Sequence, residues 1–86
     1  MIRVMPVGLG PIGALVARQI VSRSGFRIVG AVDVDPQKVD RDLGEVIDAG
    51  RTLRVRVTSD IGRTIRAARP DVAVLCTSSS LKVVLP

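Results

Sequence analysis

A glycine-rich turn lies close to the start of this chain and directly follows an apolar run. Gly8, Gly10 and Gly13 form the pattern G-x-G-x-x-G, between the apolar residues 2–7 and a segment with helical periodicity. Asp33 follows about twenty residues after the last glycine, at the end of a second apolar run. The glycine pattern alone is common. A strand before it, a helix after it and a carboxylate at this distance together predict the start of a dinucleotide-binding Rossmann unit.

Each glycine has a separate expected role in such a unit. Gly8 allows the tight turn out of the strand, Gly10 lets the backbone approach a diphosphate, and Gly13 lets the helix pack closely on the strand. The diphosphate then meets free N–H groups and the positive end of the helix dipole. A tight turn without ligand, or a domain that has lost its cofactor, is the alternative interpretation. The remaining candidate cofactor-binding residues of the loop are Leu9, Pro11 and Ile12.

The carboxylate of Asp33 is expected to accept hydrogen bonds from the hydroxyls of the adenosine ribose. Its negative charge repels a 2′-phosphate, and Asp35 adds a second negative charge nearby, so the sequence favours NAD(H). Lys38 could offset this preference by reaching a phosphate, which keeps NADP(H) open as a cofactor. The alternative role for Asp33 is a turn-forming residue before Asp35 and Pro36.

The apolar pattern along the chain predicts an α/β fold. Strands and helices alternate with short loops, which indicates a parallel sheet with right-handed crossovers. We expect a partial Rossmann fold of about four strands in the order 3-2-1-4, with flanking helices and the ligand at the switch point between the first and fourth strands. The strands are predicted over residues 2–7, 26–34, 53–57 and 71–76, and the helices over residues 11–24, 39–49 and 60–68.

Pro6 is an unusual residue for the first strand. Proline cannot donate a hydrogen bond to a neighbouring strand and is rare in the centre of a sheet. We therefore expect Pro6 either at the end of the strand or at a bulge.

A polar segment follows the fourth predicted strand, beside the switch point. Thr77 and Ser78, with Ser79, are candidates for contacts with the second face of the diphosphate or the nicotinamide ribose. A polar loop that caps the next helix is the alternative. Cys76, at the end of the strand, is expected to be a buried apolar residue rather than a nucleophile, because no base is available to activate it.

Catalytic chemistry is not visible in this sequence. The chain has no histidine, which excludes a histidine metal site, a Ser-His triad and a histidine proton shuttle. The eight acidic residues show no pairing suited to acid–base work, and no Gly-Lys-Ser/Thr of a P-loop follows the glycines. We therefore predict nucleotide binding without catalytic or metal-ligating residues.

Length and charge limit the classes of partner. Eighty-six residues correspond to one small domain. The net charge is +5, but the arginines are scattered and Phe26 is the only aromatic residue, so base-stacking platforms are missing and a solvated basic surface is expected instead of nucleic-acid binding. No apolar run approaches the length of a membrane span. A single cysteine and the lack of a signal peptide are in keeping with a cytoplasmic protein.

Three stretches resemble a known family: VGLGPIGALVARQI, FRIVGAVDVDPQKVDRDLGEV and RPDVAVLCTSSSL. They are similar to the N-terminal domain of the dihydrodipicolinate reductase family, especially the branch that includes 2,4-diaminopentanoate dehydrogenase. The similarity extends over residues 2–81. The opening and the Asp-x-Asp-Pro segment are also shared with the inositol and glucose–fructose dehydrogenase-like family.

The resemblance implies the NAD(P)-binding part of an oxidoreductase that transfers a hydride between a nicotinamide cofactor and a small imine or amino-acid substrate. It places Gly8, Gly10, Gly13 and Asp33 at the cofactor and the Thr77 segment near the nicotinamide. Residues 1–86 then form an incomplete N-terminal domain, and the substrate domain of the family is absent. The alternatives are a non-catalytic nucleotide-binding or regulatory module and an inactive fragment.

The fourth strand is expected to lack an outer neighbour. Its apolar edge, Val72 to Leu75, would then be open to pairing with another chain, which predicts a homo-oligomer.

Overall fold

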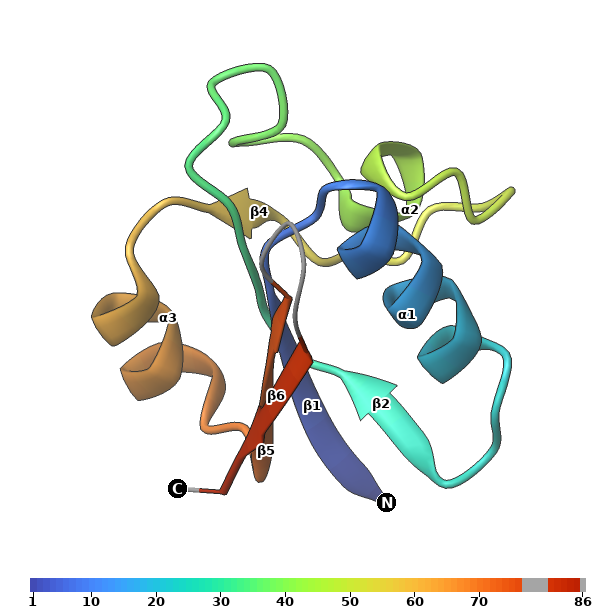
Figure 1. Ribbon diagram of the computed structural model, residues 1–86, viewed down its shortest axis with the longest axis vertical. Coiled ribbons are helices and arrows are strands. Elements are labelled where there is room, and N and C mark those ends of the chain that lie inside the picture. Colours follow the sequence, from blue (N-terminus) through green and yellow to red (C-terminus); the bar gives the residue numbers. More distant parts are fainter. Residues whose placement is uncertain (77–80, 86) are drawn as a thin grey trace.

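The computed structural model describes residues 1–76 and 81–85 of the chain. Helices and strands alternate along most of it (Figure 1). The elements are β1 (Ile2–Val7), α1 (Pro11–Val21), β2 (Phe26–Ile28), β3 (Ala31–Val32), α2 (Leu43–Val46), β4 (Val57–Thr58), α3 (Ile61–Ala68), β5 (Val72–Cys76) and β6 (Leu81–Val84).

A single sheet organises the molecule. Its strand order is β4-β3-β1-β5-β6, and β2 also pairs with β1. All pairs are parallel except β5 with β6. Since β2 and β3 together occupy the place of the second predicted strand, the predicted order 3-2-1-4 is confirmed, as is the α/β class with a partial Rossmann-like fold.

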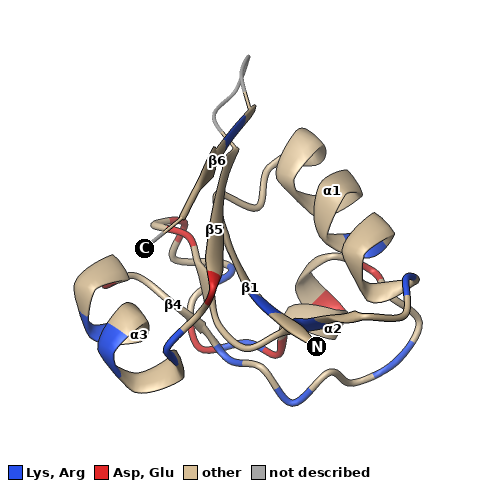
Figure 2. Cartoon of the chain, turned by 90° about the horizontal axis from the view of Figure 1, so that it is seen from below, with Lys and Arg blue, Asp and Glu red and all other residues tan. Residues whose placement is uncertain are grey.

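The sheet separates two groups of helices, with α1 and α2 on one side and α3 on the other (Figures 1 and 2). The core on the α1 side combines buried residues from both helices and the sheet: Leu9, Ala17, Ile28, Ala31, Leu43, Ile47 and Val57. On the other side, α3 approaches β3 closely at Gly30. A side chain on Gly30 would lie 2.8 Å from the Thr64 methyl carbon and 3.3 Å from the Ala68 methyl, so the helix packs against bare backbone there.

Pro6 lies inside β1 and opposite a bulge in the neighbouring strand. Val4 pairs with Ile28 and Val7 pairs with Val32. The segment from Ile28 to Val32 is therefore one residue longer than the segment of β1 that it faces. The N–H groups of Ile2 and Gly8 both point toward this neighbour, which places the missing N–H of Pro6 on the same side. The hydrogen bond that Pro6 cannot donate therefore falls at the bulge, where the regular pairing is interrupted. The same bulge divides the second predicted strand into β2 and β3.

Two predicted helices are shorter than expected. The helix predicted over residues 11–24 ends at Val21, where Ser22 forms the C-cap. The helix predicted over residues 39–49 is reduced to the four residues of α2. Asp40 has a φ of 70°, a left-handed conformation that a right-handed helix cannot include, so the helix starts after this residue. Asp48, with a φ of 55°, likewise prevents the helix from continuing toward residue 49. The helix predicted over residues 60–68 is confirmed, with Asp60 as its N-cap.

The third predicted strand is also shorter. Only Val57 and Thr58 pair with β3, because Arg54 has a φ of 59° and breaks the extended conformation that residues 53–57 would need. Burial nevertheless differs between the apolar and the arginine residues of this segment. Val57 is fully buried, and Arg54 and Arg56 are exposed.

The prediction of an open edge at Val72 to Leu75 was wrong. The strand β6 pairs antiparallel with β5, with Val74 opposite Val83 and Leu75 opposite Lys82. The apolar run that follows the polar segment supplies this strand, and its backbone groups satisfy the edge of β5. The outer edge of the sheet is therefore β6, whose residues are all exposed.

Charged side chains are distributed over several elements. Lys and Arg occur on β1, on α3 and along the connecting segments rather than on one element (Figure 2). In the described part of the chain, no helix has the length and apolar character needed to cross a membrane.

Candidate functional site

The glycine turn between β1 and α1 is fixed by close backbone packing at its two ends. Gly8 has a φ of +94°, and a side chain there would lie 2.1 Å from the carbonyl oxygen of Cys76. A side chain on Gly13 would lie 1.9 Å from the carbonyl oxygen of Gly8. Any other residue at these two positions would displace β5 or α1 from the turn, which is the steric role predicted for both glycines.

Gly10 differs from the other two glycines because open space surrounds it. A side chain there would have no atom of the described chain within 4 Å, and the φ of −68° is ordinary for any residue. Packing therefore does not explain a glycine at this position. A backbone that must be approached closely by a ligand does explain it.

The N-terminus of α1 opens onto the same space. Gly10 is the N-cap and Pro11 the first helical residue, and the first bond of the helix runs from the N–H of Ala14 to the carbonyl of Gly10. The N–H groups of Ile12 and Gly13 therefore have no acceptor within the helix. No acidic residue lies in the first turn of α1, so no side chain of the helix itself offsets the positive end of its dipole. Such an end favours an anion.

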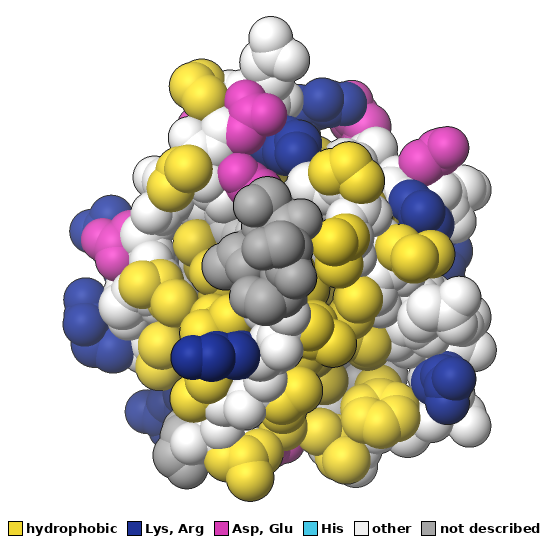
Figure 3. Space-filling view, in the orientation of Figure 1, with side chains coloured by type: hydrophobic (Ala, Val, Ile, Leu, Met, Phe, Trp, Pro, Cys, Tyr) yellow, Lys and Arg dark blue, Asp and Glu magenta, His cyan; other side chains and the backbone are white. Residues whose placement is uncertain are grey.

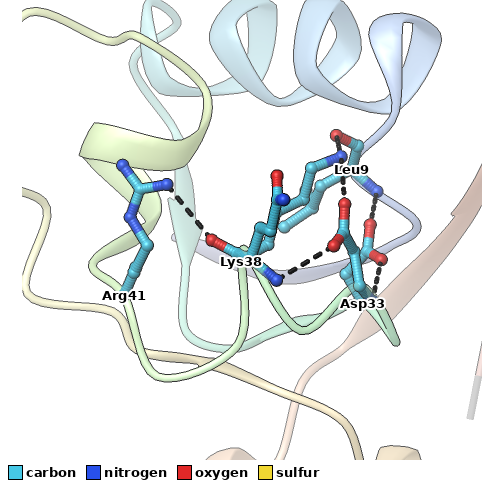
Figure 4. Close-up of polar contacts among 6 residues, drawn as sticks. Leu9, Asp33, Lys38 and Arg41 are labelled. Atoms are coloured by element: carbon cyan, nitrogen blue, oxygen red, sulfur yellow. Dashed lines mark hydrogen bonds and ion pairs between the residues drawn. The ribbon is translucent and has the colours of Figure 1, made fainter.

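Asp33 follows β3 and reaches across to the glycine turn. Its Oδ2 accepts a hydrogen bond from the N–H of Leu9 at 2.6 Å, and its Oδ1 accepts one from the N–H of Asp35 at 2.9 Å (Figure 4). The predicted alternative of a turn-forming residue is thus also present in the structure. An ionised carboxylate has about four lone-pair positions, so these two bonds leave capacity for further donors.

Lys38 lies on the same side of the turn as Asp33. Its ammonium donates to the carbonyl oxygen of Leu9 at 2.8 Å and lies 3.9 Å from Oδ2 of Asp35 (Figure 4). Arg41 holds the segment from the other end by donating to the carbonyl of Gln37 at 3.2 Å. The sequence indicated a cation near the acidic pair but not its contact with the glycine loop.

The glycine turn, Asp33 and Lys38 line one cavity of about 540 Å³. It lies at the carboxyl ends of β1, β3 and β5, which is the switch point predicted from the strand order. All candidate residues of the glycine turn and Asp33 contribute to its wall. Thr77 and Ser78, the other candidates, and Ser79 lie outside the described residues. The full lining is Gly8, Leu9, Gly10, Pro11, Ile12, Gly13, Asp33, Asp35, Lys38 and Cys76.

Cys76 is one of the residues that line this cavity, at the end of β5. Its thiol is free, and burial raises its pKa above the ordinary value of 9.0. A thiol with a raised pKa is protonated at neutral pH, which makes it a poor nucleophile. The raised pKa agrees with the expectation that Cys76 is not a nucleophile, but Cys76 is half-buried and lines the cavity, whereas a buried residue was expected.

Asp42 is a polar residue whose role the sequence did not reveal. Its carboxylate accepts hydrogen bonds from the N–H groups of Gly44, Leu53 and Val55, at 2.9, 2.9 and 3.1 Å. Burial alone would raise the pKa of Asp42, but these backbone donors outweigh it and lower the pKa. Asp42 thus ties α2 to the segment before β4 and supports the core under α1. A small polar residue before a short helical run was the only sequence signal.

Comparison with known proteins gives relatives of two kinds. No family model matches the chain. It is 32% identical over 82 residues to an amine dehydrogenase from Streptomyces virginiae, an alignment that covers 95% of this chain and 22% of that protein. It is 32% identical over 76 residues to the redox-sensing transcriptional repressor Rex from Caldicellulosiruptor saccharolyticus, with coverage of 87% of this chain and 32% of the repressor.

A solved structure extends this similarity to three dimensions. The amine dehydrogenase from Mycobacterium smegmatis matches with a TM-score of 0.79 and 38% sequence identity, over 84% of this chain and 21% of that chain. The chain therefore spans between 21% and 32% of the length of these three proteins. Their names do not include dihydrodipicolinate reductase, and the resemblance to that family stays a prediction.

Proposed function

We propose that this chain binds a nicotinamide dinucleotide in the cavity over the glycine turn. The observation that carries the proposal is the open space at Gly10. It adjoins both the N-terminus of α1 and the carboxylate of Asp33. In this assignment the N–H groups at the start of α1 hold the diphosphate, and the remaining lone pairs of Asp33 accept the hydroxyls of the adenosine ribose.

The charges around the cavity favour NAD(H) over NADP(H). Asp33 and Asp35 contribute two carboxylates to the cavity wall, and in this proposal each disfavours a 2′-phosphate on the adenosine ribose. Lys38 provides one cation, but its ammonium already contacts the carbonyl of Leu9. The proposed preference for NAD(H) therefore rests on two acidic side chains in the cavity wall and on one lysine whose ammonium is already hydrogen-bonded within the chain.

We further propose that the chain is the cofactor-binding part of an oxidoreductase that acts on a small amine, imine or amino acid. The similarity to two amine dehydrogenases supports this class of substrate. When bound, the nicotinamide supplies or accepts the hydride. The chain's own residues bind and orient the dinucleotide. In this proposal, groups outside the 86 residues position the substrate.

A second candidate function is a redox-sensing nucleotide module without catalysis. The similarity to a redox-sensing transcriptional repressor favours it. The two candidates differ in what they require of the cofactor. A sensor must bind the oxidised and reduced nucleotides with clearly different affinities, since only a differential affinity can shift an equilibrium between states. Titration with NADH and with NAD⁺ tests the sensor, because equal affinities for the two nucleotides would exclude it.

The selectivity is tested by calorimetric titration of the purified chain with NADH and with NADPH. We expect NADH to bind more tightly, and we expect Asp33→Asn to reduce the difference, because the substitution removes the negative charge and keeps the shape. Asp48→Asn, an exposed acidic residue away from the cavity, is the matched control. Equal or tighter binding of NADPH by the unmodified chain contradicts the preference.

A further inference from the structure

Leu9 is held by three separate contacts, although it lies between two glycines. Its side chain is 2% exposed and belongs to the core under α1. Its N–H donates to Oδ2 of Asp33 at 2.6 Å, and its carbonyl oxygen accepts from the ammonium of Lys38 at 2.8 Å (Figure 4). The segment Gly8–Gly10 is therefore held in place at its middle residue.

Both polar partners of Leu9 come from one short segment that is itself held by hydrogen bonds. Oδ1 of Asp33 accepts from the N–H of Asp35, and Oδ1 of Asp35 accepts from the N–H of Gln37, both at 2.9 Å. The carbonyl of Asp35 accepts from the N–H of Lys38 at 2.9 Å. Residues 33–38 thus form a braced turn that contacts the glycine loop at two points.

The contact of Lys38 determines how one peptide group of the glycine loop is oriented. All peptide bonds of the described chain are trans, and in a trans peptide the C=O and the N–H point in opposite directions. Because the ammonium holds the carbonyl of Leu9, the N–H of Gly10 in the same peptide group points away from Lys38. Without this bond, glycine at position 10 would allow the peptide to rotate.

We propose that Lys38 is a positioning residue of the dinucleotide site. It orders the Leu9–Gly10 peptide before the ligand arrives, which lowers the entropic cost of binding. The inference depends on the proposed function for its effect on affinity. The side chain of Lys38 is 27% exposed, and its ammonium also lies beside the carboxylate of Asp35. The positive charge of Lys38 is therefore already partly balanced within the chain. The role assigned to it is to hold the loop and not to contact a phosphate.

The test compares Lys38→Met and Lys38→Arg with the unmodified chain. Lys82→Met on β6 is the matched control, since it removes the same charge at a residue that does not line the cavity. Two measurements are made on each variant. One is calorimetric titration with NADH and NADPH, and the other is amide hydrogen exchange of the ligand-free chain by NMR. Circular dichroism confirms that each variant is folded.

We expect Lys38→Met to raise the Kd for both dinucleotides by about tenfold, the effect of losing one charge-assisted hydrogen bond. Lys82→Met should leave the Kd within about twofold, and Lys38→Arg should recover part of the loss. In the ligand-free chain, Lys38→Met should accelerate exchange of the Leu9 amide, which donates to Asp33, by about tenfold and leave the amides of β1 unchanged.

Other outcomes overturn the inference. Unchanged exchange of the Leu9 amide, together with a loss confined to NADPH, would make Lys38 a ligand of the 2′-phosphate. Equal effects of Lys38→Met and Lys82→Met would reduce its role to net charge. If the unmodified chain binds neither dinucleotide, the proposed function fails. The exchange measurement then still decides whether Lys38 orders the loop.

Discussion

At the scale of single residues, the three glycines of the turn do different work. Gly8 and Gly13 are required by close contacts within the chain, since a side chain at either would lie about 2 Å from a backbone carbonyl oxygen, at 2.1 and 1.9 Å. Gly10 has no such neighbour. The same chemical change at two of these positions should therefore separate a requirement of the fold from a requirement of the ligand.

We expect Gly13→Val to lower the free energy of unfolding by about 1–3 kcal/mol, because the added carbon atoms would overlap backbone that cannot easily move aside. Urea denaturation followed by circular dichroism measures this loss. Gly10→Val is the matched control and should change the stability much less, because its side chain enters open space. Equal losses for both variants would contradict the packing described for Gly13.

At the scale of elements, period-two and helical patterns predicted which segments form the sheet and which cover it. They could not predict where elements stop. The positive φ values at Asp40 and Arg54 shorten α2 and β4. The residues on either side of Arg54 both donate their N–H groups to Asp42, which lies more than ten positions earlier in the sequence. The pairing of β6 with β5 could not be predicted either, because local sequence patterns do not show which strands become neighbours.

The stability contributed by Asp42 should depend on pH. Its pKa in the folded chain is lowered below the ordinary value of 3.8, so its contribution is present above that value and is lost as the pH falls through the folded pKa. Denaturation with urea from about pH 7 down to about pH 2 should show this loss. Asp42→Asn should lower the stability at neutral pH by about 1–3 kcal/mol and flatten the acid dependence.

Asp48→Asn is the control for that series, because Asp48 is exposed. It should leave both the neutral stability and its acid dependence close to those of the unmodified chain. If Asp42→Asn retains the full acid dependence, the three backbone hydrogen bonds to Asp42 do not control it.

At the scale of the whole molecule, one face is strongly apolar. Hydrophobic side chains gather over the side that carries β6 (Figure 3). Val83 is 62% exposed and Leu81 is 52% exposed, on a strand whose outer edge has no neighbour among the described residues. Exposed apolar strands at a sheet edge tend to pair with another chain. The reason for expecting association thus moves from β5 to β6.

We expect the purified chain to form dimers or larger species, as measured by light scattering over a range of concentrations. Val83→Lys places a charge on the exposed edge strand and should shift the population toward monomer. Ile61→Lys makes the same kind of change at an exposed residue of α3 and should not. A monodisperse monomer formed by the unmodified chain at high concentration would contradict this expectation.

The candidate site was predictable to the extent that the sheet topology assembles it. Parallel strands in the order predicted bring the glycine turn and Asp33 to one edge, and both line the same cavity. The bond between Lys38 and Leu9 was not predictable, because it depends on the hydrogen bonds that fold residues 33–38 into a turn.

The binding of NADH by Gly10→Val tests the central claim most directly. The substitution places a side chain in the open space at the start of α1, where a Cβ has no neighbour within 4 Å, so calorimetric titration should show binding by the unmodified protein and none by the variant. Gly62→Val on α3, outside the cavity, should bind like the unmodified protein. A folded Gly10→Val variant that binds NADH with unchanged affinity would contradict the account, since the glycine turn would then be a structural turn and not a dinucleotide site.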